Sequence, residues 1–179
     1  MPPGLPRGTV TFLFTDVEDS TRVWEQAPTD MADGLRVHDA IVRGAIERHG
    51  GYVFGIGRDG FCAAFWTAAD AAAAAIESQE QLRDNAAINF LVRMGLHTGE
   101  ATERDRNYFG SEVNRTARLM SLAHGGQVLV SDATEVLLRH RVALRALGEH
   151  RLRGLRGRMS GVPGRCRRTP HRVPRAAKR

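Results

Sequence analysis

The chain contains 179 residues, which is enough for one domain with a hydrophobic core and short for two. Hydrophobic residues make up 42% and charged residues 26%, a composition that excludes a chain disordered throughout. No apolar stretch reaches the roughly 18–20 residues of a membrane-spanning helix, and residues 1–7 lack the apolar core of a signal peptide. Cys62 and Cys166 form neither a disulfide framework nor a metal-ligand pattern. We therefore expect a cytoplasmic protein without a membrane partner.

The positive charge is concentrated at the end of the chain. Residues 151–179 hold 11 of the 26 basic residues and no acidic one, whereas residues 1–150 carry 15 basic and 20 acidic residues. The high pI, near 10.5, therefore results from the basic end of the chain and does not indicate a basic binding face on the folded domain. We expect an N-terminal extension at 1–7, a folded domain at 8–156 and a disordered Arg- and Pro-rich tail at 157–179.

The chain begins with an apolar strand that ends in a carboxylate. The β-branched and aromatic run Gly8–Asp16 predicts a buried strand. Ser20 and Thr21 then predict the start of a helix, and apolar positions at helical spacing predict a second helix over 30–49.

A glycine-rich turn predicts a β-hairpin in the middle of the chain. Tyr52–Phe54 and Phe61–Phe65 flank this turn, which places Asp59 near its tip. The alanine-rich segment Thr67–Arg83 that follows predicts a helix.

Strands and helices continue to alternate in the second half. The pattern predicts strands at Phe90–Gly99 and 127–131, helices at 111–122 and 133–140, and a strand at 142–147. No apolar alternation follows residue 156, so we expect no further strand. Because the central hairpin is antiparallel, we expect an α+β sandwich of ferredoxin type, with helices packed on a mostly antiparallel sheet.

Two aspartates from separate segments are candidate metal ligands. Asp16 ends the first strand, and Asp59 lies in a hairpin that can pair beside it. Mg²⁺ and Mn²⁺ bind few protein oxygens and complete their shell with water and substrate phosphate. The alternative is that each aspartate only caps a turn.

Two further groups of residues are candidates for contact with phosphate. Asn114 and Arg118 are four residues apart, on one face of the predicted helix, where an arginine can bind a phosphate and an asparagine can orient a hydroxyl. A solvated polar pair is the alternative. His97 closes an apolar strand, and we expect a hydrogen-bonded core histidine there, not a catalytic base. The loop after Asp16 is a candidate anion site and comprises Val17, Glu18, Asp19, Ser20 and Thr21.

Together these segments resemble the catalytic domain of class III adenylate and guanylate cyclases, in their compact actinobacterial form. The resemblance extends over roughly residues 8–156 in the family order. Five segments carry it: Phe12–Thr21, Gly51–Phe54 with Asp59–Phe65, Val92–Glu100, Gly110–Leu119 and Gly125–Ser131.

The resemblance implies conversion of a nucleoside triphosphate, ATP in preference to GTP, to its 3′,5′-cyclic nucleotide and pyrophosphate. It implies that Asp16 and Asp59 hold two divalent ions, Mg²⁺ or Mn²⁺, and that the loop 17–21 wraps the β- and γ-phosphates. Asn114 matches the residue that orients the ribose, and Arg118 matches the one that neutralises the α-phosphate. It also implies a homodimer with active sites at the interface, each taking its metals from one protomer and its Asn–Arg pair from the other.

Four positions differ from the family pattern or match it only approximately. Gly55 stands where relatives have a base-reading lysine, and Asn107 stands where adenylate cyclases have Asp or Thr. Arg58 replaces the glycine before the metal aspartate, which predicts strain if this position has a positive φ. Arg153 is the nearest match to a phosphate-contacting basic residue.

These departures leave two alternatives to an active cyclase. One is a cyclase-homology domain that is catalytically impaired and acts as a nucleotide-binding or dimerising regulatory module. The other is association with nucleic acid through the basic tail, which the confinement of charge to the chain end disfavours.

Overall fold

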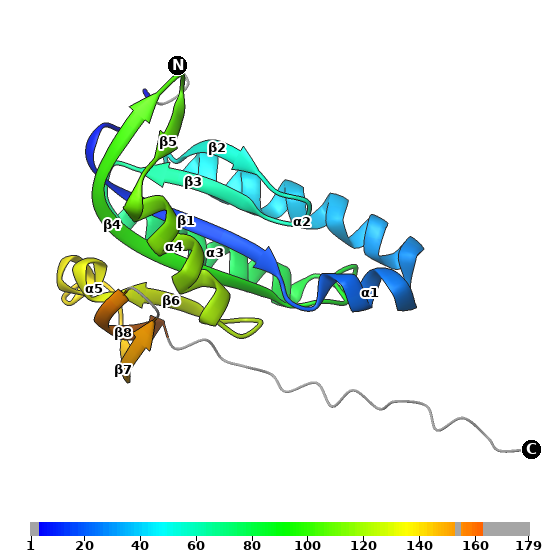
Figure 1. Cartoon of the computed structure of the whole chain (residues 1–179). Coiled ribbons are helices and arrows are strands. Elements are labelled where there is room, and N and C mark those ends of the chain that lie inside the picture. The colour runs from blue at the N-terminus through cyan, green and yellow to red at the C-terminus, as the bar shows by residue number, and fades with distance from the viewer. Residues whose placement is uncertain (1–3, 153–154, 163–179) are drawn as a thin grey trace, which may run out of the picture.

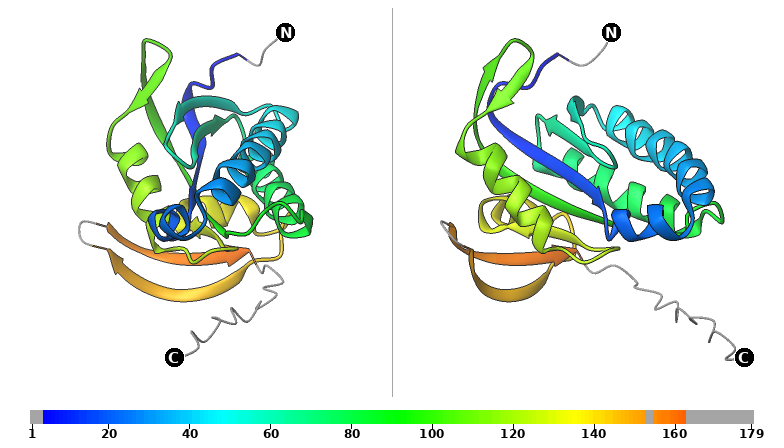
Figure 2. Two further views of the ribbon diagram at one scale, coloured as in Figure 1. Left: turned by 90° about the vertical axis from the view of Figure 1, so that its right-hand side faces the viewer. Right: turned by 45° about the vertical axis from the view of Figure 1, so that its right-hand side comes forward.

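The computed structural model describes residues 4–152 and 155–162, and the structural statements below concern those residues. One central sheet carries helices on both of its faces (Figures 1 and 2). None of the described helices is long and apolar enough to cross a membrane. The elements are β1 Gly8–Val17, α1 Ser20–Gln26, α2 Pro28–Arg48, β2 Tyr52–Ile56, β3 Phe61–Phe65, α3 Ala68–Asp84, β4 Val92–Arg104, β5 Asn107–Phe109, α4 Ser111–Leu122, β6 Val128–Ser131, α5 Asp132–Leu138, β7 Arg145–Leu152 and β8 Leu155–Val162.

The strands form one mostly antiparallel sheet. Their order is β2-β3-β1-β4-β6-β8-β7, with β5 paired to β4 outside this path. Every neighbouring pair is antiparallel except β4 and β6, which run parallel. The expected α+β class with a mostly antiparallel sheet is confirmed.

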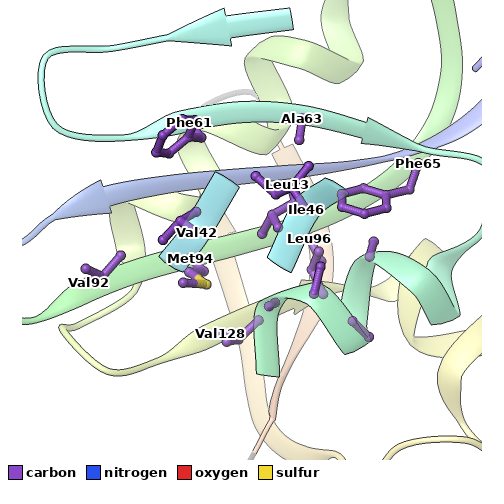
Figure 3. Packing of buried hydrophobic residues seen from close by; sticks show 14 of the residues in the cluster. Leu13, Val42, Ile46, Phe61, Ala63, Phe65, Val92, Met94, Leu96 and Val128 are labelled. Carbon is purple, nitrogen blue, oxygen red and sulfur yellow. The ribbon is translucent and has the colours of Figure 1, made fainter. Parts of the chain in front are cut away.

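The two faces of β1 build two separate cores, because successive side chains of a strand point to opposite faces. Leu13 belongs to the larger core, with side chains of α2 and α3, and Figure 3 shows it among Val42, Ile46 and Leu96. Phe12 belongs to a second, aromatic core on the face that α4 covers. The sheet is therefore buried on both sides at β1.

Alanines allow α3 to lie close to the sheet. Ala71, Ala74 and Ala75 are fully buried, and the helix begins where the Thr67 side chain accepts a hydrogen bond from the Asp70 amide at 3.1 Å. Small side chains on the buried face let the helix approach the sheet closely. The helix predicted at 67–83 is confirmed within one residue.

The end of the sheet differs from the sequence-based expectation. We predicted no strand after residue 156 and a strand at 142–147, whereas β7 spans Arg145–Leu152 and β8 spans Leu155–Val162. β8 pairs with both β6 and β7, so the sheet continues six residues past the predicted boundary at 156. Backbone hydrogen bonds do not require apolar side chains, and β8 buries Ser160 and Gly161, which an apolar pattern does not detect. The tail at 163–179 lies outside the described residues.

The strand predicted at Phe90–Gly99 is longer than expected and forms an arm with β5. β4 continues to Arg104, turns through Asp105 and Arg106, which have φ of 55° and 62°, and returns as β5. Tyr108 fixes the arm, since its hydroxyl donates a 2.6 Å hydrogen bond to the Pro6 carbonyl. The turn contains no glycine, so the usual hairpin signal is missing from the sequence.

Candidate active site

Pairing of β1 with β3 brings Asp16 and Asp59 into neighbouring segments. Phe14 is opposite Cys62, and the Phe61 amide donates a 2.9 Å hydrogen bond to Thr15 Oγ1. Gly60 lies so close to β1 that a Cβ on it would be 3.1 Å from the Asp16 Cα. The turn that carries Asp59 therefore lies beside the end of β1 that carries Asp16. Joint metal binding by the two carboxylates stays a prediction.

The turn before Asp59 is not strained by Arg58. We predicted strain if this position had a positive φ, and Arg58 is not among the non-glycine residues with positive φ. The Gly57 amide closes the turn with a 2.8 Å hydrogen bond to the Gly60 carbonyl, and neither glycine has a positive φ. No residue of this turn needs glycine's conformational freedom, so Arg58 is accommodated with an exposed side chain.

Arg93 holds Asp16. The two residues are cross-strand neighbours in β1 and β4, and the guanidinium Nε and Nη2 donate hydrogen bonds of 2.8 and 2.5 Å to Asp16 Oδ2. The sequence alone does not indicate this role, because an arginine inside an apolar strand becomes informative only once the register places an acid opposite it.

The candidate phosphate loop runs from the end of β1 into α1. Val17 is the last, buried residue of β1, and Ser20 and Thr21 begin the helix. Asp19 precedes the helix in a left-handed conformation with φ of 53° and forms a 3.6 Å ion pair with Arg22. The Glu18 amide donates to the Leu91 carbonyl at 2.9 Å and so fixes the loop on the start of β4. Phosphate binding by this loop remains a prediction.

Asn114 and Arg118 lie on the exposed side of α4. Both side chains are exposed, whereas Thr116 and Leu119 of the same helix are buried. Gly95 permits the close packing behind them, since a Cβ there would lie 2.7 Å from the Met120 amide nitrogen. The pair therefore faces away from the sheet.

His97 and Glu112 fasten the first turn of α4 to β4. His97 is fully buried, its Nε2 lies 2.5 Å from Glu112 Oε2, and its Nδ1 lies 2.8 Å from Ser131 Oγ. Burial lowers the pKa of His97. Burial alone would raise the pKa of Glu112, but hydrogen bonds from His97 and Ser111 lower it. A neutral His97 thus donates from Nε2 to an ionised Glu112, which confirms the expected hydrogen-bonded core histidine.

The two positions that the resemblance assigns to base reading, Gly55 and Asn107, belong to neighbouring strands. Gly55 is in β2 and Asn107 begins β5, and the neighbouring Phe54 and Tyr108 rings are 4.8 Å apart in an edge-to-face arrangement. Asn107 is exposed, and its Oδ1 accepts a 2.8 Å hydrogen bond from the Tyr108 amide. The remaining candidate, Arg153, lies outside the described residues.

The residues present suit a divalent ion that relies on its substrate for further ligands. Asp16 and Asp59 supply hard oxygen donors, and the described residues contain no cluster of three or more His, Cys, Asp or Glu arranged for a metal. Mg²⁺ and Mn²⁺ accept two carboxylates and take water and phosphate oxygens as well. The donor set therefore fits such ions.

The fold is a mostly antiparallel sheet with helices on both faces (Figure 2). The candidate metal ligands lie at the end of β1 and in the turn before β3, and the candidate Asn–Arg pair lies on α4. The family model of the adenylate and guanylate cyclase catalytic domain matches residues 5–162. The chain belongs to this family.

Individual relatives agree with the family match. The uncharacterized protein Rv0891c of Mycobacterium tuberculosis is 47% identical over 156 residues, covering 84% of this chain and 53% of its own length. The adenylate cyclase of Podospora anserina is 30% identical over 155 residues, covering 71% of this chain and 7% of its own length. A solved Trypanosoma brucei adenylate cyclase in its monomeric state superimposes with a TM-score of 0.83 at 27% identity, covering 90% of this chain and 93% of that one. The chain spans about half the length of the mycobacterial relative.

Proposed function

We propose that this chain is a nucleotidyl cyclase that converts a nucleoside triphosphate, ATP in preference to GTP, to a 3′,5′-cyclic nucleotide and pyrophosphate. The observation that supports this most is the approach of the Asp59 turn to Asp16, because the family reaction needs two carboxylates at one metal site. Family membership and the Asn114–Arg118 pair on α4 agree with it.

Each residue has a distinct task in this reaction. Asp16 and Asp59 would hold Mg²⁺ or Mn²⁺, which lowers the pKa of the ribose 3′-hydroxyl and stabilises charge on the α-phosphate. Asn114 orients the ribose so that its 3′-oxygen is directed at the α-phosphorus. Arg118 neutralises the charge that develops on the α-phosphate as the bond to pyrophosphate breaks. The loop 17–21 holds the β- and γ-phosphates.

Two protomers complete each active site in this proposal. Asn114 and Arg118 are exposed on α4, and exposed apolar side chains occur on both the β2–β3 hairpin and the β4–β5 arm, at Ile56 and Phe109. A partner that covers these side chains removes apolar surface from water. A homodimer would thus bring the carboxylates of one protomer to the Asn–Arg pair of the other.

A regulatory module that binds nucleotide without turnover is the second candidate. Gly55 and Asn107 support it, because neither provides the charged base reader of the family. Its signature is nucleotide binding with no cyclic product.

The test is an incubation of the purified chain with Mn²⁺ and ATP or GTP, followed by mass-spectrometric detection of cyclic nucleotide. Formation of cyclic product that disappears in Asp16→Ala supports the cyclase. No product with either nucleotide, under conditions in which a family member turns over, would refute it, and nucleotide binding in the same samples would then favour the regulatory module.

Restoring a lysine at position 55 is expected to improve the use of ATP. A Cβ at Gly55 would lie 3.2 Å from the Cys62 Cβ, so a side chain is accommodated with a small shift. A new hydrogen bond from a charged group to the base is worth about 1.5–3 kcal/mol, so we expect Gly55→Lys to lower KM for ATP by roughly ten- to hundredfold. Gly57→Lys adds the same charge to the same hairpin and is the control. Equal KM values for the two variants would contradict base reading at position 55.

A further inference from the structure

Arg93 occupies one oxygen of the aspartate that the proposed function assigns to the metal. Both hydrogen bonds from the guanidinium end on Asp16 Oδ2, and within the described part of the chain Oδ1 is the oxygen left for another cation. The side chains of Arg93 and Asp16 are only 28% and 26% exposed. Water therefore screens this pair less than it screens a surface ion pair.

We propose that Arg93 competes with the divalent ion for Asp16 and thereby sets the metal affinity of the site. This inference rests on the proposed function, since it takes Asp16 as a metal ligand. The positive charge of Arg93 acts in two ways: it occupies Oδ2, and it repels a second cation that approaches the same carboxylate. Metal binding must therefore weaken the Arg93–Asp16 pair. The cost of weakening this pair lowers the measured affinity for the metal.

Arg93 also has a second hydrogen-bond acceptor, on α4. Its Nη1 donates a 3.4 Å hydrogen bond to the Ser121 carbonyl in the last turn of α4. That turn has no basic residue of its own, so the guanidinium also complements the negative end of the helix dipole. Arg93 can release Asp16 and remain bound to α4. The arginine thus connects the metal end of the protomer with the helix that carries Asn114 and Arg118.

The test is a titration of the full chain with Mn²⁺ alone, without nucleotide, followed by calorimetry or by the electron paramagnetic resonance of free Mn²⁺. Removing the charge in Arg93→Gln is expected to tighten Mn²⁺ binding by about three- to tenfold. Arg93→Met should tighten it as well, while Arg93→Lys, which keeps the charge, should stay near the wild-type value. Asp16→Asn should lose the binding in both the wild-type and Arg93→Gln backgrounds, which assigns the signal to this site.

Arg48→Gln is the matched control. Arg48 donates from Nε and Nη2 to Glu77 Oε1 at 3.0 and 2.6 Å, the same geometry at a surface contact between α2 and α3. Its replacement should leave Mn²⁺ affinity unchanged.

The outcomes separate this inference from the proposed function. Equal or weaker Mn²⁺ binding in folded Arg93→Gln or Arg93→Met, with clear binding in the wild type, would overturn the competition and make Arg93 an orienting residue for Asp16. Absence of Mn²⁺ binding in the wild type and in every Arg93 variant would overturn the metal site, and the inference with it. Circular dichroism of each variant identifies the folded ones.

Discussion

Asp16→Asn is expected to lower cyclic nucleotide formation by a factor on the order of 100–1,000, because metal stabilisation of the transition state is worth several kcal/mol. Asparagine has the shape of aspartate but no charge, so the variant removes one of two carboxylates while leaving the packing of β1 intact. The measurement is the initial rate of product formation at saturating nucleotide and Mn²⁺, with circular dichroism to verify the fold.

Asp33→Asn is the control for Asp16→Asn. Asp33 also forms an ion pair with an arginine, Arg36, but it is exposed on α2. We expect the rate of this variant to match the wild type. An Asp16→Asn protein that kept more than about half of the wild-type rate would contradict metal binding by Asp16, since loss of several kcal/mol cannot be that mild.

Gly95→Ala is expected to destabilise the fold by about 1–3 kcal/mol, the usual cost of an overpacked core. Gly95 lies in the middle of β4, opposite Phe14 on one side and Leu129 on the other. A Cβ there would lie 2.7 Å from the backbone nitrogen of Met120 and 2.9 Å from its Cα. Backbone atoms of a helix cannot move alone, so α4 must shift as a unit and carry Asn114 and Arg118 with it.

Thermal unfolding measures this effect, and each kcal/mol corresponds to roughly 2–4 °C in Tm for a chain of this size. Gly44→Ala is the control, and we expect it to change stability in the opposite direction. Gly44 lies inside α2, where a Cβ would meet only the flexible end of Arg48, and alanine should raise stability by about 0.5–1 kcal/mol. A Gly95→Ala protein with unchanged Tm would show that α4 does not pack as tightly on β4 as described.

The sequence predicted those parts of the site that depend on local patterns. The apolar run before Asp16 and the glycine-rich turn before Asp59 mark a strand and a hairpin, and pairing of the two follows from burial of both. The helix that carries Asn114 and Arg118 was predicted with the bounds that the structure has.

Features that depend on distant partners were not predicted. Arg93 and Asp16 are 77 residues apart in the chain, and only the register of β1 and β4 brings them together. The final strand β8 buries Ser160 and Gly161, which carry no apolar signal. The β4–β5 arm turns at Asp105 and Arg106, where glycine or asparagine is usual. In each case the tertiary partner, and not the local sequence, determines the structure.

Mixing two inactive variants tests the shared active site most directly. In a dimer, Asp16→Ala and Arg118→Ala protomers combine so that one site contains both defects and the other contains neither. Equal amounts that exchange freely should therefore recover about one quarter of the wild-type cyclase rate, because half of the dimers carry one intact site of two. A mixture that stays at the background of the separate variants, while the wild type is active, would contradict a site built from the aspartates of one protomer and the Asn–Arg pair of another.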